Sequence, residues 1–237
     1  MPAHPLDRPV WSALTTRQSG LALGDARALR IRPDYGPFGA AADASAESLA
    51  ALAGLITEVD PLWVVETGDA PVPRGIQVRR RAELVQMTAE AMTAGTPPRF
   101  AMIDLVEADA AEMRALAHLT EPGPFLAMTH RLGAFVGVKQ DGRLVAMSGE
   151  RMRPEGFTEV SAVCTHPDCR GRGYAGALMR VVMGRILDRG ETPFLHAYAS
   201  NAGAIGLYET LGFKVRRPMV SLVLALTGAS NDSATPR

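Results

Sequence analysis

The stretch Arg170–Gly176, which reads Arg-Gly-Arg-Gly-Tyr-Ala-Gly, combines residue types that suit the binding of an anion. It follows a β-branched run that ends at Pro167, as a buried strand does, and it precedes a helical pattern that extends to Gly190. The first N–H groups of such a helix have no partner within it, and the helix dipole attracts negative charge. Gly171 and Gly173 leave room for the backbone to approach a phosphate. We therefore expect this turn to hold a pyrophosphate.

Two other phosphate-binding loops can be compared with this turn. A Walker loop needs Gly-Lys-Ser/Thr, but the two lysines of the chain, Lys139 and Lys214, lie elsewhere. Gly171–Gly176 does satisfy the Rossmann pattern G-x-G-x-x-G, and Glu191 follows Gly171 by twenty positions. This match keeps an NAD(P)-binding enzyme open as an alternative, although its position late in an antiparallel-looking run of strands counts against it.

The spacing Arg170-x-x-Gly173-x-Ala175 resembles the acyl-CoA loop of the GNAT superfamily of N-acetyltransferases. Downstream, the segment 201–213 is similar to the second motif of that family, with Asn201, with Tyr208 seven residues later and with a closing Leu-Gly-Phe. The two motifs occur in the expected order, and the resemblance covers residues 100–226. Within it, Val-Cys-Thr-His-Pro at 163–167 resembles the glycine-N-acyltransferase-like subgroup.

The resemblance implies an α/β (α+β) fold in which helices flank a mixed, mostly antiparallel sheet. It also implies acetyl-CoA as acyl donor and a primary amine of a small molecule or peptide as acceptor, with no metal. The implied acyl-CoA-binding residues are Val163, Cys164, Thr165, Arg170, Gly171, Arg172, Gly173, Tyr174, Ala175, Gly176, Asn201 and Tyr208. Main-chain groups of Val163 and Thr165 would pair with the pantetheine arm as an added strand does.

Three residues are candidates for proton transfer. The resemblance implies that the Tyr208 hydroxyl donates a proton to the departing CoA thiolate. Glu159 and His196 are both candidates for the base that deprotonates the acceptor, because a charge in a buried strand needs a reason and His196 precedes Asn201 by five residues. Each of the three could instead be structural: a packing tyrosine, a solvated strand end and a core histidine.

A non-catalytic acyl-CoA-binding or regulatory module is the alternative from a different functional class. It would keep the phosphate cradle without the chemistry, and the presence of Tyr208 argues against it. Acceptor specificity in such a fold is expected from residues 113–132 and 216–222. Arg216-Arg217 could attract a carboxylate-bearing acceptor there, or could simply be a solvated sheet edge.

The composition of the 237 residues excludes several classes of partner. The net charge of zero gives no reason to expect nucleic acid or an anionic membrane as partner, and 47% hydrophobic residues support a folded core. Neither a signal peptide nor a membrane span is recognisable. Cys164 and Cys169 flank His166 and Asp168, but a matched set of metal ligands is lacking, so reduced thiols in a cytoplasmic protein are predicted.

Residues 1–97 are predicted to form a small α/β N-terminal unit, and a degenerate copy of the second half is one interpretation of it, although it repeats none of the motifs. Its expected elements are a helix at 6–14, a strand at 28–32, a turn at 34–38, a helix capped by Asp43 or Ser45, and strands at 62–65 and 76–87. Gly95-Thr-Pro-Pro98 marks the expected boundary.

Residues 98–226 are predicted to form the acetyltransferase unit, followed by a disordered tail at 227–237. Its expected strands are 100–106, 134–138, 143–147, 157–165, 193–199 and 213–226, and its expected helices are 109–120, 125–132, 173–190 and 201–212. Asp141-Gly142 predicts a tight hairpin between the second and third strands.

Overall fold

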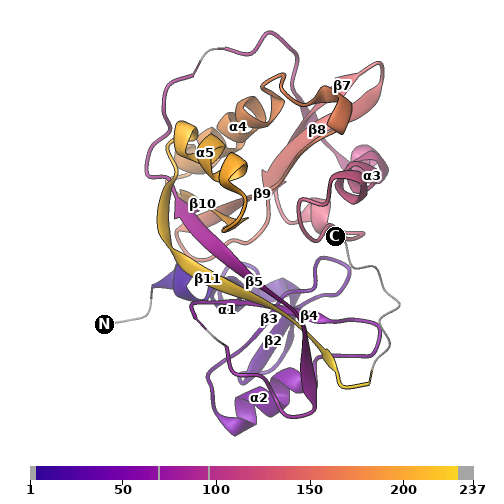
Figure 1. Ribbon diagram of the computed structural model, residues 1–237, viewed down its shortest axis with the longest axis vertical. Coiled ribbons are helices and arrows are strands. Elements are labelled where there is room, and N and C mark those ends of the chain that lie inside the picture. The colour runs from indigo at the N-terminus through magenta and orange to yellow at the C-terminus, as the bar shows by residue number, and fades with distance from the viewer. Residues whose placement is uncertain (1–3, 69, 96, 229–237) are drawn as a thin grey trace.

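The computed structural model describes residues 4–68, 70–95 and 97–228, and it begins with a series of short elements (Figure 1). These are α1 (Pro9–Thr15), β1 (Ala22–Gly24), β2 (Ala28–Ile31), β3 (Gly39–Ala41), α2 (Ala46–Ala53), β4 (Leu62–Glu66) and the long β5 (Ile76–Thr88). The Ser45 hydroxyl accepts a hydrogen bond from Ser48 N at 3.2 Å, so Ser45 rather than Asp43 caps α2. The predicted turn at 34–38 leads directly into β3, which the sequence did not indicate.

The remaining elements follow the predicted order with one exception. They are β6 (Ile103–Leu105), α3 (Ala110–Thr120), β7 (Phe135–Gln140), β8 (Arg143–Glu150), β9 (Phe157–Thr165), α4 (Tyr174–Asp188), β10 (Thr192–Tyr198), α5 (Ala202–Leu211) and β11 (Lys214–Leu226). Asp141 and Gly142 both have positive φ, as the predicted β7–β8 hairpin requires. Of the predicted tail, residues 229–237 lie outside the described part of the chain.

The helix predicted at 125–132 is wrong: only a 3-10 turn, Thr129–Arg131, forms there. The Thr129 hydroxyl explains the difference, because it accepts a hydrogen bond from Leu126 N and donates one to Tyr35 O. The Phe125 ring also packs edge-on against Phe135, with ring centroids 5.8 Å apart. These contacts hold the segment against both halves of the molecule in a non-helical path.

Within the described residues, the main sheet contains eight strands in the order β4-β11-β5-β10-β9-β8-β7-β6. Only the β9–β10 pair is parallel, and every other neighbouring pair in this sheet is antiparallel. Helices α3, α4 and α5 flank this sheet (Figure 1). The predicted fold class, a mixed and mostly antiparallel sheet with flanking helices, is confirmed.

The N-terminal segment contributes two strands to this sheet. β5 lies between β10 and β11, and β4 pairs with the other side of β11 at the sheet edge. The β5 and β11 arrows cross the middle of the molecule side by side and join its two halves (Figure 1). The segments before and after the boundary predicted near residue 97 therefore share one sheet. Their division into two folding units stays a prediction.

The sheet opens between its two parallel strands. β10 pairs with β9 only over Thr192–Phe194 opposite Phe157–Glu159, and the two strands diverge beyond Glu159. On its other side, β9 bulges against β8, where Ala162 has a φ of +51° and the register shifts. The bulge and the divergence together turn the second half of β9 toward an open region of the sheet.

Helix α4 covers the sheet beside this opening. Its inner face consists of six buried residues, Tyr174, Leu178, Met179, Val182, Met183 and Ile186. Each large apolar side chain that is fully buried in this way contributes about 1.5–3 kcal/mol relative to exposure. None of the described helices is long and apolar enough to cross a bilayer.

Candidate active site

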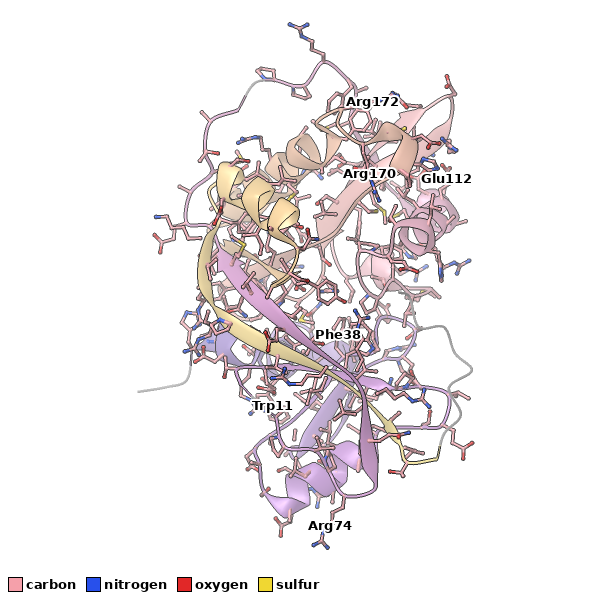
Figure 2. All side chains as sticks on the ribbon, in the orientation of Figure 1. Trp11, Phe38, Arg74, Glu112, Arg170 and Arg172 are labelled. Carbon is pink, nitrogen blue, oxygen red and sulfur yellow. The ribbon has the colours of Figure 1, made fainter. Side chains whose placement is uncertain are left out.

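The glycine-rich turn leads directly into α4. Gly171 and Gly173 have φ values of +76° and +77°, a backbone conformation that side chains with a Cβ rarely adopt. Gly173 occupies the N-cap position, and no side chain there accepts from the first-turn N–H groups. Arg170 and Arg172 lie near this end of α4 (Figure 2). The turn thus offers unpaired N–H donors and positive charge, as an anion site requires.

A cavity of about 540 Å³ opens at this turn. It runs between the end of β9, the turn and the start of α5, and it is lined by every residue that the sequence analysis assigned to acyl-CoA binding: Val163, Cys164, Thr165, Arg170, Gly171, Arg172, Gly173, Tyr174, Ala175, Gly176, Asn201 and Tyr208. Because β9 and β10 have diverged here, the cavity reaches into the sheet. The structure therefore brings the whole predicted set together in one place.

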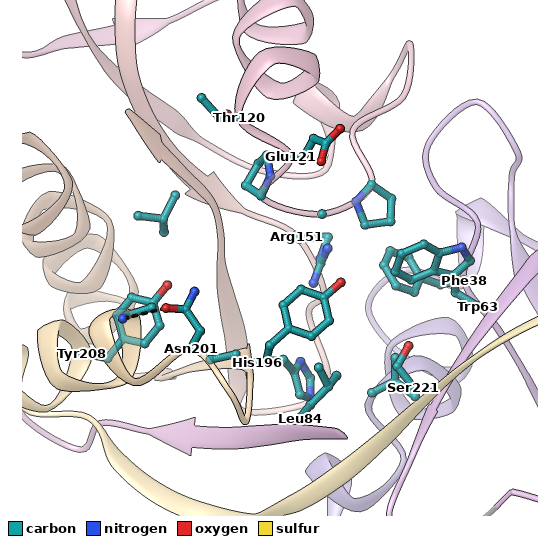
Figure 3. A pocket seen from close by; sticks show the side chains of 18 residues that line it. Phe38, Trp63, Leu84, Thr120, Glu121, Arg151, His196, Asn201, Tyr208 and Ser221 are labelled. Atoms are coloured by element: carbon teal, nitrogen blue, oxygen red, sulfur yellow. Dashed lines mark hydrogen bonds between the residues drawn. The ribbon is translucent and has the colours of Figure 1, made fainter. Parts of the chain in front are cut away.

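A second pocket of about 250 Å³ adjoins the first (Figure 3). Thr120, Val163, Asn201, Ala204 and Tyr208 line both cavities, so these residues form the junction between them. The far wall of the second pocket carries aromatic side chains of the N-terminal segment, Phe38 and Trp63, whose ring centroids lie 6.3 Å apart. We call this second space the acceptor pocket.

Tyr208 stands at the junction, on α5. Its ring packs against Phe213 with the centroids 6.2 Å apart, and burial raises the pKa of its phenol. The hydroxyl therefore keeps its proton near neutral pH and can act only as a donor there. Asn201 caps the same helix, because its Oδ1 accepts a hydrogen bond from Ala204 N at 3.1 Å.

Glu159 is fully buried below the acceptor pocket, between a cation and an imidazole. Arg151 Nε donates to Oε2 at 2.8 Å, Arg151 Nη2 donates to Oε1 at 2.9 Å, and His196 Nδ1 lies 2.8 Å from Oε1. Burial raises the pKa of this carboxyl, but Arg151 and His196 outweigh that effect and hold the pKa below its usual value. Glu159 is thus an ionised counterion, and it is not among the residues that line the acceptor pocket.

His196 lines the acceptor pocket, but both of its ring nitrogens have partners. The Gln86 amide fixes the arrangement: its Oε1 accepts from Arg216 Nη1 at 2.8 Å, so its Nε2 is the donor to Leu6 O at 2.8 Å. The same Nε2 lies 3.1 Å from His196 Nε2 and supplies its second hydrogen. The Nε2 of His196 thus faces the Gln86 amide donor, and its Nδ1 faces the Glu159 carboxylate, so both ring nitrogens are engaged.

Arg216 and Arg217, considered above as a possible attraction for a carboxylate, are paired elsewhere. Both donate to Asp7 Oδ1, at 2.6 and 2.7 Å, and neither lines the acceptor pocket. The reason is the N-terminal segment, whose Asp7 lies against this part of β11. That interpretation of the pair is wrong.

Sequence reasoning did not single out Phe38, Trp63, Arg151 or Tyr198, which line the acceptor pocket. Glu121 lies within the range 113–132 that was expected to set acceptor specificity. One signal was available, since a glutamate inside a buried strand requires a nearby cation and Arg151 is an arginine eight positions earlier. Glu121 has a φ of +50°, and the left-handed conformation of a residue with a Cβ is a recurrent feature of functional sites. No local pattern indicated Phe38 or Trp63.

The two cysteines are free thiols, both buried, and both line the cavity at the glycine-rich turn. Burial raises the pKa of Cys164 to about 11, so its thiol stays protonated. In the described part of the chain, no group of three or more His, Cys, Asp or Glu side chains is arranged to hold a metal ion.

Comparisons with known proteins agree with this geometry. The family model described as FR47-like protein matches residues 135–221. The crystal structure of an acetyltransferase from the GNAT family of Novosphingobium aromaticivorans is 47% identical, covers 95% of this chain and 100% of its own, and superposes with a TM-score of 0.89. The chain belongs to the GNAT family.

Two more distant relatives of this GNAT protein extend the comparison. A mycothiol acetyltransferase from Thermomonospora curvata is 30% identical over 181 residues, which are 73% of this chain and 56% of that protein. The chain thus spans little more than half the length of that relative. A GCN5-related N-acetyltransferase from Kribbella flavida, 18% identical with a TM-score of 0.60 over 90% of this chain and 95% of its own, shares the fold.

Proposed function

We propose that this GNAT protein transfers an acetyl group from acetyl-CoA to a primary amine of a small molecule or peptide. The observation that carries the proposal is the junction of the two cavities at Tyr208, with the phosphate-binding turn at the far end of one and a polar, aromatic pocket in the other. A donor in the first cavity and an acceptor in the second would meet beside a phenol that holds its proton. Acetyl-CoA would supply the acetyl group as a thioester.

The residues around the first cavity fit such a donor. The N–H groups at the start of α4, with Gly171 and Gly173 in their left-handed conformation, suit a pyrophosphate. Beyond Glu159 the backbone of β9 no longer pairs with β10, so its edge can bind an extended arm as an added strand. A β9 amide turned outward at the Ala162 bulge would also stabilise the oxygen of the thioester as it becomes anionic.

Tyr208 would donate its proton to the leaving thiolate, which the resemblance implies and its raised pKa supports. We assign proton removal from the amine to water at the mouth of the acceptor pocket, next to Glu121. Among the residues that line the two cavities, Glu121 carries the one carboxylate. Glu159 and His196, the bases predicted from the sequence, are better suited to positioning Arg151 because their polar atoms are already engaged.

Purified protein supplied with acetyl-CoA and a panel of amines tests this function. We expect CoA release that depends on the amine, together with thermal stabilisation of the protein by CoA. A non-catalytic acyl-CoA-binding module would show the stabilisation without the release, and an NAD(P)-binding enzyme would be stabilised by the nicotinamide cofactor instead. Either outcome would contradict the proposal. Membership of the glycine-N-acyltransferase-like subgroup and a cytoplasmic location stay part of it.

A further inference from the structure

One cation lies within the acceptor pocket, and it is held rigidly. The Arg151 guanidinium is clamped by Glu159 through Nε and Nη2, and its Cζ lies 4.8 Å from the centroid of the Phe38 ring. Its side chain is only 14% exposed. Both constraints fix the plane of the guanidinium, so its remaining N–H groups point in one direction. Figure 3 shows Arg151 between Tyr208 and Asn201 on one side and Phe38 and Trp63 on the other.

The hydrogen-bond inventory of Arg151 is incomplete. A guanidinium has five N–H donors, and Glu159 accepts from Nε and from one hydrogen of Nη2. Among the described residues, Nη1 has no hydrogen-bond partner. Gly123 forms the pocket wall beside it, and a Cβ added at that glycine would lie 3.7 Å from Nη1. The Nη1/Nη2 edge is therefore a second bidentate edge, available to a ligand. Donors in so enclosed a place are nearly always satisfied in a working protein.

A second donor lines the same pocket. Arg80 Nη2 donates to the Tyr198 hydroxyl oxygen at 3.2 Å, and the Arg80 guanidinium also lies 5.3 Å from the Tyr198 ring centroid. Since the oxygen already accepts from Arg80, the hydroxyl proton is directed elsewhere. Tyr198, like Arg151, lines the acceptor pocket, so the pocket presents two kinds of donor to an anion.

We infer that the acceptor is a small molecule that carries a carboxylate as well as its amine, and that the free Nη1/Nη2 edge of Arg151 binds the carboxylate. This inference rests on the proposed function, because it names the substrate class of that site. A planar carboxylate matches a guanidinium edge in two parallel hydrogen bonds. The aromatic wall of Phe38 and Trp63 would then pack against the apolar part of the acceptor, while its amine extends toward Tyr208.

Glu159 and His196 acquire a role in this arrangement. The carboxylate of Glu159 fixes Arg151, and His196 in turn donates to Glu159 Oε1, which orients the carboxylate. They are positioning residues, and they act on the acceptor only through Arg151. The buried Arg151–Glu159 ion pair thus orients the guanidinium so that its Nη1/Nη2 edge faces the pocket.

Matched acceptors test the inference in the unaltered protein. Phenylalanine, phenylalanine amide and phenethylamine share an amine and an apolar ring, but only the first has a carboxylate. We expect kcat/KM for phenylalanine to exceed that for the other two by about 10- to 100-fold, the effect of a hydrogen-bonded charge pair. Equal kcat/KM across the three would overturn this inference alone. If none of the amines supports turnover, the proposed function is overturned, and this inference is overturned with it.

Arg151→Lys tests the residue, because it keeps the positive charge beside Glu159 but removes the bidentate edge. We expect the preference for phenylalanine over phenethylamine to fall by about 10-fold or more, mainly through KM. The matched control is Arg153→Lys, a nearby arginine that faces Glu191 at 3.7 Å and does not line the acceptor pocket. An unchanged preference in Arg151→Lys would refute the assignment, and the wild-type comparison stands even if this variant does not fold.

Discussion

At the scale of single residues, Tyr208 combines a packing role with the proton-donating role that we propose, and substitution can separate the two. Tyr208→Phe keeps the ring against Phe213 but removes the proton. We expect turnover to fall by about 100-fold with little change in CoA affinity, because the hydroxyl acts on the leaving group. Steady-state kinetics with a good acceptor measure this, and Tyr35→Phe, a tyrosine outside both cavities, is the control. Unaltered turnover would leave Tyr208 a packing residue.

Glu159 can be tested at the same scale through stability. Glu159→Gln would leave the buried Arg151 guanidinium without its counterion, and breaking a buried ion pair on one side costs about 3–5 kcal/mol. We expect the free energy of unfolding in urea to fall by that order at pH 7. A fall of less than about 0.5 kcal/mol, the range of ordinary surface substitutions, would mean that Glu159 is not the anchor of Arg151.

At the scale of elements, the start of α4 decides whether the donor binds. Gly173→Asp would place a carboxylate at the N-cap where a phosphate is expected, whereas Gly173→Asn has nearly the same shape without the charge. Both residues tolerate a positive φ, so the pair separates charge from strain. We expect titration calorimetry to show that Asp weakens CoA binding about 100-fold more than Asn does. Equal CoA affinities of the two variants would mean that the phosphate does not bind at the start of α4.

The start of β10 adds a prediction about pH. Glu191 accepts hydrogen bonds from Arg17, just beyond α1, and from Thr158 on β9. Burial raises the pKa of Glu191, but these two hydrogen bonds outweigh it and bring the pKa to about 2. Because the folded-state pKa is depressed, this stabilisation is present above the ordinary glutamate value of about 4.3 and is lost as the pH falls toward 2.

Glu191→Gln should therefore lower the free energy of unfolding by about 1–3 kcal/mol at pH 7, and the difference from wild type should shrink between pH 4 and 2.5. Urea titrations of both proteins across that range measure it. Glu155→Gln, in an exposed turn, is the control and should change little at any pH. A difference that stays constant with pH would show that the ionised carboxylate is not what stabilises the contact.

Most helices and strands were predictable from the sequence, but the distant segments that each of them packs or pairs with were not. The β7–β8 hairpin and the α4 boundaries follow from local signals, a Gly turn and a 3.6-residue period, that act within a few residues. That the proposed acyl-CoA-binding residues line one cavity was predictable for the same reason, since they lie in two short segments. The acceptor pocket was not, because Phe38, Trp63 and Arg151 are brought together by strand pairing between distant segments.

At the scale of the whole molecule, the shared sheet predicts that residues 98–226 cannot fold on their own. A fragment of residues 98–226 would lack β5, leaving β10 and β11 without the strand that separates them. Two unpaired inner strand edges favour aggregation. We expect this fragment to be insoluble or to unfold without a cooperative transition, while the full chain unfolds in one. A soluble fragment with cooperative thermal unfolding would support the boundary near residue 97.

The position of β5 also has a consequence for synthesis of the protein on the ribosome. Its two neighbours, β10 and β11, begin more than one hundred residues later in the chain, at Thr192 and Lys214. Translation at about 5–20 residues per second leaves β5 outside the exit tunnel for several seconds before either neighbour has been made. During that interval the N–H and C=O groups on both edges of β5 have no strand of this sheet to pair with. We therefore expect chaperones or early contacts within the nascent chain to shield β5, because its place in the sheet is complete only after β10 and β11 have been synthesised.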